Sequence, residues 1–364
     1  MRTPSRFPNS IPAVYPLKVK EGNYLHLDFQ DAGGKLMDHS GRSNHCLVYG
    51  AVPVAGRNGW ARNFDGVDDY ILDTLGRKIL REGTAGKWES VEIGKATKIV
   101  GTGTGLYLNR GDLLPPKFTG KFVSDFASYC TGLVNFSCDN NQFSGVLPSF
   151  SACTGLVNFY CYSNQFSGVL PSFSACTSLV NFYCSLNQFS GVLPSFSACT
   201  SLVTFQCSLN QFSGVLPSFS TCTSLVNFYC YSNQFSGVLP SFSTCTSLVT
   251  FYCSSNQFSG VLPSFSTCTS LVTFQCYSNQ FSGYTAESFK TQKNMSACDM
   301  RYNAITNSAD INLILADLRY SKENIVGRVN CDVKLEGGTN AVPTGQGLVD
   351  KDFLNANGWT VTTN

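Results

Sequence analysis

The strongest constraint on this fold is a 23-residue unit that recurs seven times without a gap, beginning at Cys130. In the copy that begins at Cys222 the unit reads CTSLVNFYCYSNQFSGVLPSFST. A fixed period of roughly 20 to 50 residues builds one structural unit per copy, and stacked units share a core that no single unit could bury. The repeat therefore predicts an elongated solenoid.

Apolar residues occupy positions 1, 4, 7, 9, 14, 18 and 21 of the unit. Positions 7 and 9 alternate with polar neighbours, which is typical of a short strand with one buried face. We expect strands near residues 134–138 and every 23 residues thereafter. They should stack in parallel over about nine to ten coils. The asparagine at position 12 follows each strand, and its amide should satisfy backbone groups exposed by the bend there.

The stretch from Leu225 to Pro240 has the pattern L-x-x-F-x-C-x-x-N-x-F-S-G-x-L-P. This pattern resembles the leucine-rich repeat, and its S-G-x-L-P part resembles the plant-type subclass. The resemblance covers about residues 107–320. It implies an α/β, mostly β, solenoid with a parallel sheet on its concave face.

Four parts are predicted along the chain. They are a Pro-rich N-terminal arm at 1–20, a small β module at 21–106, the solenoid at 107–320 and a helix-containing C-terminal cap at 321–364. Apolar spacing predicts helices over residues 309–320 and 347–358, and strands at 329–337 and 359–364.

Both ends of the chain carry weaker resemblances. Residues 21–106 are similar to the opening of a concanavalin-like (laminin-G-like) domain, through YLHLDFQD, DHSGRSNHCLVYGA and ARNFDGVDDYILD, but are too short for a complete one. Asp65, Asp68 and Asp69 are interpreted as a turn between strands rather than a calcium site. Residues 338–364 resemble C-terminal segments of repeat proteins in some bacteriophages and bacterial surface proteins.

The cysteines point to reduced core thiols. Of 17 cysteines, 14 fall at positions 1 and 9 of the unit. Free cysteine behaves as a small buried apolar residue. Side chains stacked in register point the same way, so they do not converge on disulfides. Because the repeats also contain no histidine, we expect neither a metal site nor another cofactor. Free thiols are typical of a protein that folds in a reducing cytoplasm.

Charge excludes several classes of function. No Asp, Glu, Lys, Arg or His occurs from Asn140 to Ala286. Nucleic acid is therefore not an expected partner, because binding to phosphates requires Lys and Arg. The repeats also lack an acid–base pair, so an enzyme is not expected. No apolar run of about 18 residues predicts membrane insertion. The first residues lack the apolar core of a secretion signal, so export by that route is not expected.

The copies differ mainly at strand positions that point away from the core, and these predict a neutral binding face. The candidate ligand-binding residues are Tyr160, Tyr162, Tyr183, Tyr229, Tyr231, Tyr252, Tyr277, Asn227 and Thr250. Rigid tyrosine rings with a polar tip are common in recognition surfaces. Alternatively, these residues are simply soluble and compatible with a strand.

Together these features predict a non-enzymatic adhesion protein, a bacteriophage virion-surface or fibre component assembled in the host cytoplasm. Its N-terminal arm would contact virion structural proteins, its concave face would bind a host-surface glycan or protein, and an oligomer is compatible with the sequence. Two alternatives remain open. One is a purely structural decoration or spacer of such a particle, and the other is a cellular leucine-rich-repeat interaction protein located extracellularly or at the cell surface.

Overall fold

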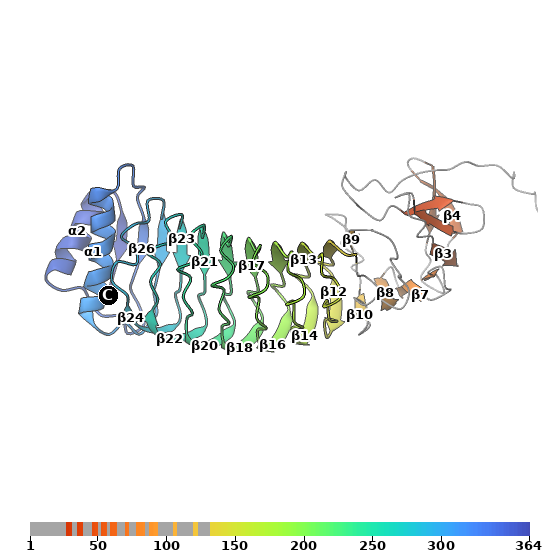
Figure 1. Ribbon diagram of the computed structural model, residues 1–364, viewed down its shortest axis with the longest axis horizontal. Coiled ribbons are helices and arrows are strands. Elements are labelled where there is room, and N and C mark those ends of the chain that lie inside the picture. Colours follow the sequence, from red (N-terminus) through yellow and green to blue (C-terminus); the bar gives the residue numbers. More distant parts are fainter. Residues whose placement is uncertain are drawn as a thin grey trace, which may run out of the picture.

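The computed structural model describes residues 132–364 continuously, and within residues 27–122 it describes only the strands. The N-terminal arm, the Asp65–Asp69 turn and Cys130 lie outside the described residues. Residues 132–364 form an elongated row of coils that ends in two helices (Figure 1).

One side of the coils is an eleven-stranded parallel sheet. Its strands are β9 (Gly105–Tyr107), β11 (Asn135–Ser137), β13 (Asn158–Tyr160), β15 (Asn181–Tyr183), β17 (Thr204–Gln206), β19 (Asn227–Tyr229), β21 (Thr250–Tyr252), β23 (Thr273–Gln275), β25 (Ala297–Asp299), β26 (Asp332–Lys334) and β27 (Thr360–Thr362). Equivalent positions pair directly, so Phe228 is aligned with Phe205 and Phe251. The predicted strand position and its 23-residue spacing are confirmed.

A second, fourteen-stranded sheet forms the opposite side of the coils. Its parallel strands are β10 (Thr119–Phe122), β12 (Gln142–Gly145), β14 (Gln165–Val169), β16 (Gln188–Val192), β18 (Gln211–Val215), β20 (Gln234–Val238), β22 (Gln257–Leu262) and β24 (Gln280–Tyr284). The repeat pattern itself predicts no strand in this segment of the unit. It forms a strand because the same segment of the next coil lies alongside and pairs with it, as Ser213 does with Gln234.

The same sheet continues into the N-terminal strands. These are β1 (Leu27–Gln30), β2 (Lys35–Asp38), β3 (Cys46–Tyr49), β6 (Tyr70–Leu72), β7 (Lys78–Gly83) and β8 (Lys87–Ile93). They pair antiparallel in that order, and β8 then pairs in parallel with β10. A separate antiparallel hairpin joins β4 (Val52–Gly56) and β5 (Gly59–Asn63).

Columns of phenylalanine fill the space between the two sheets of the solenoid. Phe228, Phe235 and Phe242, at positions 7, 14 and 21 of one copy, are completely buried. Phe228 lies 4.9 Å from Phe242 in an edge-to-face arrangement and 5.4 Å from the parallel ring of Phe251, measured between ring centroids. Both geometries are favourable for aromatic pairs. Each ring therefore packs within its own coil and against the next coil.

The asparagine at position 12 joins neighbouring coils, as its predicted structural role requires. Asn233 Nδ2 donates to the carbonyl oxygens of Cys230 (3.2 Å) and of Cys207 in the preceding coil (3.0 Å). Its Oδ1 accepts a hydrogen bond from the Phe212 amide of that preceding coil at 3.0 Å. The same contacts recur from Asn164 to Asn279.

All fifteen cysteines from Cys138 to Cys331 are buried and free, including thirteen of the fourteen in the repeats. The Cys222 thiol points at the carbonyl oxygens of Phe196 (3.7 Å) and Cys199 (3.6 Å). Burial raises the pKa of the Cys199 thiol to about 12. These thiols are therefore protonated core groups at neutral pH.

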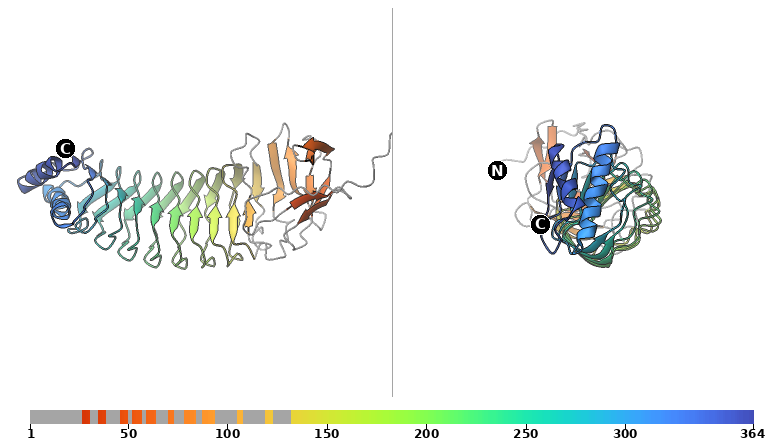
Figure 2. Two further views of the ribbon diagram at one scale, coloured as in Figure 1. Left: turned by 90° about the horizontal axis from the view of Figure 1, so that it is seen from above. Right: turned by 90° about the vertical axis from the view of Figure 1, so that its left-hand side faces the viewer.

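Two helices follow the last repeat strands, α1 (Ser308–Asn324) and α2 (Gln346–Ala356). The side chain of Asn307 accepts a hydrogen bond from the Ala309 amide and starts α1. Figure 2 shows α1 lying across the end of the coils. The buried Tyr284 hydroxyl at the end of β24 donates to Asp317 of α1 at 2.8 Å. Within the described residues, no helix is long and apolar enough to span a membrane.

Candidate ligand-binding groove

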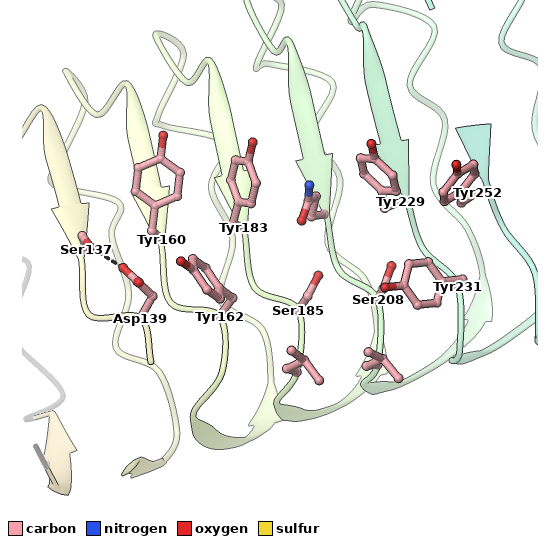
Figure 3. A pocket seen from close by; sticks show the side chains of 13 residues that line it. Ser137, Asp139, Tyr160, Tyr162, Tyr183, Ser185, Ser208, Tyr229, Tyr231 and Tyr252 are labelled. Carbon is pink, nitrogen blue, oxygen red and sulfur yellow. Dashed lines mark hydrogen bonds between the residues drawn. The ribbon is translucent and has the colours of Figure 1, made fainter. Parts of the chain in front are cut away.

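A groove of about 780 Å³ lies on the outward side of the eleven-stranded sheet (Figure 3). Six of the seven tyrosines that we predicted to bind a ligand line this groove, so the structure brings them together. They are Tyr160, Tyr162, Tyr183, Tyr229, Tyr231 and Tyr252.

Strand geometry explains why these side chains share one face. Successive residues of a strand point to opposite sides, so Phe228 and Cys230 enter the core while Tyr229 and Tyr231 point outward. In-register strands lie roughly 4.8 Å apart, so equivalent positions of successive copies form straight columns. Position 8 supplies one column of groove side chains and position 10 supplies another.

The first aromatic group of the groove is Tyr160, Tyr162 and Tyr183. The ring centroid of Tyr183 lies 5.0 Å from that of Tyr160 and 6.4 Å from that of Tyr162. Burial raises the pKa of Tyr162, and a hydrogen bond involving Asp139 raises it further. Asp139 accepts hydrogen bonds from Ser137 and from Asn140 Nδ2, so its charge is held at this end of the groove.

The second aromatic group is Tyr229, Tyr231 and Tyr252. Tyr229 and Tyr252 meet edge to face with ring centroids 5.2 Å apart. Burial raises the pKa of Tyr229, and a hydrogen bond with Thr250 opposes that rise. Figure 3 shows Tyr231 beside Ser208, on the side of this group that faces the middle of the groove.

Three predicted residues do not line the groove. Asn227 and Thr250 are half-buried and directly paired at the starts of β19 and β21. Tyr277 belongs to the last copy, where the Arg301 guanidinium lies 5.9 Å from the centre of its ring. A binding role for each of the nine candidate residues remains a prediction.

The middle of the groove contains residues that the sequence did not single out. Leu186 and Leu209 line it at position 11, together with Ser185, Gln206 and Ser208. Position 11 varies between copies, and leucine occurs there only in the third and fourth. The restriction of leucine to these two copies was the sequence signal that could have pointed to the middle of the groove. It could not be interpreted without knowing that the two leucines border the same groove.

The described residues show no metal centre, since no group of three His, Cys, Asp or Glu side chains among them could hold an ion. Asp139 is the one charged side chain among those lining the groove. The groove therefore offers aromatic rings and neutral hydrogen-bonding groups.

Comparison with solved structures identifies the architecture. The complex of PEPR1 with AtPEP1 superimposes with a TM-score of 0.55 and 26% identity, covering 66% of this chain and 33% of that chain. The Arabidopsis receptor kinase HAESA, solved with the peptide hormone IDA and the co-receptor SERK1, gives 0.52 and 22%, covering 69% and 40%. The fold is a leucine-rich-repeat-like solenoid.

The similarity covers only part of the length of these solved structures. The chain covers only 23% of the Arabidopsis thaliana GASSHO1/SCHENGEN3 ectodomain, at 27% identity over 51% of this chain and a TM-score of 0.49. It thus spans a third or less of the length of several of these structures. No family model and no curated protein matches the chain. The GASSHO1/SCHENGEN3 structure is the LRR ectodomain of a plant membrane receptor kinase, solved in complex with CASPARIAN STRIP INTEGRITY FACTOR 2.

Proposed function

We propose that this protein is a non-enzymatic binding protein whose groove holds a neutral ligand, a glycan or protein on a host surface. The main support is the location of the positions at which the copies differ. Positions 12 to 22 are identical in the first six copies, whereas positions 8, 10 and 11 vary and supply the side chains that line the groove. Variation at these three positions is thus concentrated on the groove.

The chemistry of the groove supports a neutral ligand. Tyrosine buries a large ring at a small cost in conformational entropy and keeps a hydroxyl for hydrogen bonding. Serine and glutamine add donors and acceptors without charge. With Asp139 confined to one end, the rest of the groove has no charged group to pair with a charged ligand.

The proposed setting is the surface of a bacteriophage particle, with residues 1–20 contacting virion structural proteins. Three features support it: the resemblance of residues 338–364 to phage and bacterial surface repeat proteins, the small N-terminal β module and the buried free thiols. Free thiols suit assembly in a reducing cytoplasm. A gene located among capsid and tail genes, and the protein found by mass spectrometry in purified particles, would test this setting.

The binding proposal is tested by replacing Tyr229, Tyr231 and Tyr252 together with alanine. Attachment to host cells and to a neutral glycan array should fall at least about tenfold, because aromatic anchors carry most of the energy of such interfaces. The matched control replaces Gln188, Gln211 and Gln234 with alanine, since these side chains are exposed on the opposite sheet. Unchanged attachment by a folded triple-tyrosine variant would instead favour a structural spacer.

A further inference from the structure

We infer that the middle of the groove is a preformed subsite for one neutral sugar ring that carries an apolar substituent, such as a methyl or acetyl group. The subsite, called here the central slot, is formed by Ser185, Leu186, Gln206, Ser208 and Leu209. This inference rests on the proposed function, because it specifies what the groove binds.

Tyrosines on the flanking coils form the two walls of the central slot. Along position 10, Ser185 and Ser208 stand between Tyr162 and Tyr231, as Figure 3 shows. Three strand spacings separate the backbones of those two tyrosines, about 14 Å in all. A ring held between two aromatic side chains needs about 7–8 Å, twice the usual contact distance. The spacing therefore leaves room for at least one saturated ring between the walls.

The floor of the central slot carries an unused hydrogen-bonding group. Ser208 is only 1% exposed, and its Oγ has no hydrogen-bond partner. Such a buried hydroxyl destabilises the folded protein unless something bonds to it. The half-buried Gln206 lies two residues earlier and adds an amide donor and acceptor to the groove. A sugar hydroxyl at this point would bond to Ser208 and remove the penalty.

Folding does not explain why the edge of the central slot is apolar. Leu186 and Leu209 have φ angles of 57° and 56°, a region that non-glycine residues seldom occupy. They are 48% and 39% exposed, so they gain little from burial. The remaining copies have Asn or Ser at this position. Contact with an apolar group of the ligand explains why leucine stands only at the slot.

These features favour a sugar over a peptide. Tyrosine rings stack on the apolar face of a sugar ring, while hydroxyl and amide groups bond to its edge. A peptide running along the coils would have to pass over Tyr162 and Tyr231, which stand on either side of the central slot (Figure 3). A single ring lies between them without crossing either.

The test uses residues that other copies already carry at the same positions. Ser208→Tyr fills the central slot with the residue found at position 10 in the second, fifth and seventh copies. Leu186→Ser with Leu209→Ser restores the residue of the fifth copy at position 11. Ser254→Tyr is the matched control, because it makes the Ser208 change at a position 10 that does not line the groove.

Binding is measured on an array of neutral oligosaccharides that end in 6-deoxyhexose, N-acetylhexosamine or unsubstituted hexose. We expect Ser208→Tyr to lose at least tenfold in affinity and Ser254→Tyr to bind like the parent protein. The double leucine variant should lose the preference for methyl- or acetyl-bearing sugars while its thermal unfolding stays the same.

Three outcomes would overturn the central slot. If Ser208→Tyr and the leucine variant bind normally while the triple tyrosine variant does not, the groove binds its ligand elsewhere and the proposed function survives. If the parent protein ignores every sugar but binds a host protein through the tyrosines, the ligand class is wrong. If the triple tyrosine variant also attaches normally, the proposed function fails together with the slot.

Discussion

Val192 of one coil covers Gly214 of the next, so closely that a Cβ added to Gly214 would lie 3.3 Å from Val192 Cγ2. Gly214 also has a φ of +74°. The same pairing of valine and glycine recurs at each coil from Gly168 to Gly260. Position 17 of one copy therefore packs against position 16 of the next along the second sheet.

Gly214→Ala should destabilise the solenoid. Placing an L-residue in the left-handed region costs roughly 1–2 kcal/mol, and the new methyl group would also press on Val192. Denaturant unfolding, monitored by far-UV circular dichroism, should show the loss. Gly155→Ala is the control, because nothing lies within 4 Å of its Cβ position. Equal stability of the two variants would contradict this account of the glycine.

Asn210→Ala should break the link between two neighbouring coils. The Phe189 amide would lose its acceptor at 3.0 Å. The carbonyl oxygens of Cys184 and Cys207 would each lose one of two asparagine donors and keep the other, Asn187 and Asn233 respectively. Leaving the buried Phe189 amide without its partner costs about 1–3 kcal/mol. Hydrogen exchange should accelerate first around Phe189. Asn227→Thr, which occurs naturally at position 6 in other copies, should leave exchange unchanged.

Stability should fall as the pH rises above about 9. Burial raises the pKa of Cys176 and Cys245 to about 11 and that of Cys199 and Cys268 to about 12, from an ordinary value of 9.0. Below pH 9 a thiol is protonated whether the chain is folded or unfolded, so its contribution is intact. Between pH 9 and the folded pKa only the unfolded thiol ionises. Each such thiol then removes about 1.4 kcal/mol per pH unit.

This thiol effect can be measured by urea unfolding in reductant at pH 7, 9 and 10. Cys199→Val with Cys222→Val should weaken the pH dependence, because valine is apolar and does not titrate. Alkylation should label the fifteen described thiols only after denaturation. A stability that is flat up to pH 11, or disulfide-linked peptides from adjacent coils, would show that the thiols are not protonated core groups.

Ligand attachment through the groove should depend little on ionic strength. Salt screens interactions between charges, and the groove has one charged side chain, Asp139, already held by Ser137 and Asn140. Affinity should change less than about twofold when salt rises from about 0.05 M to 0.5 M. Asp139→Asn should not alter this response. A steep fall with salt would place the contact on the charged ends of the chain.

Much of this structure follows from the repeat alone. Alternation around Phe228 and Cys230 predicts a strand, and the structure has β19 there. The constant Asn233 predicts a bonded amide at the exit of that strand, and it bonds to both coils. These features are set by side-chain periodicity and by local backbone needs, which a short stretch of sequence contains.

Other features came only from the stacking of coils. The segment from Gln234 to Val238 has no clear strand pattern, and it forms β20 because its partners lie one coil away on either side. Likewise, the sequence around Leu186 does not distinguish it from any other exposed leucine. It borders the groove because in-register stacking brings Leu209 and Ser208 beside it. The repeat unit thus determined the coil, whereas contacts between residues one coil apart decided the second sheet and the groove.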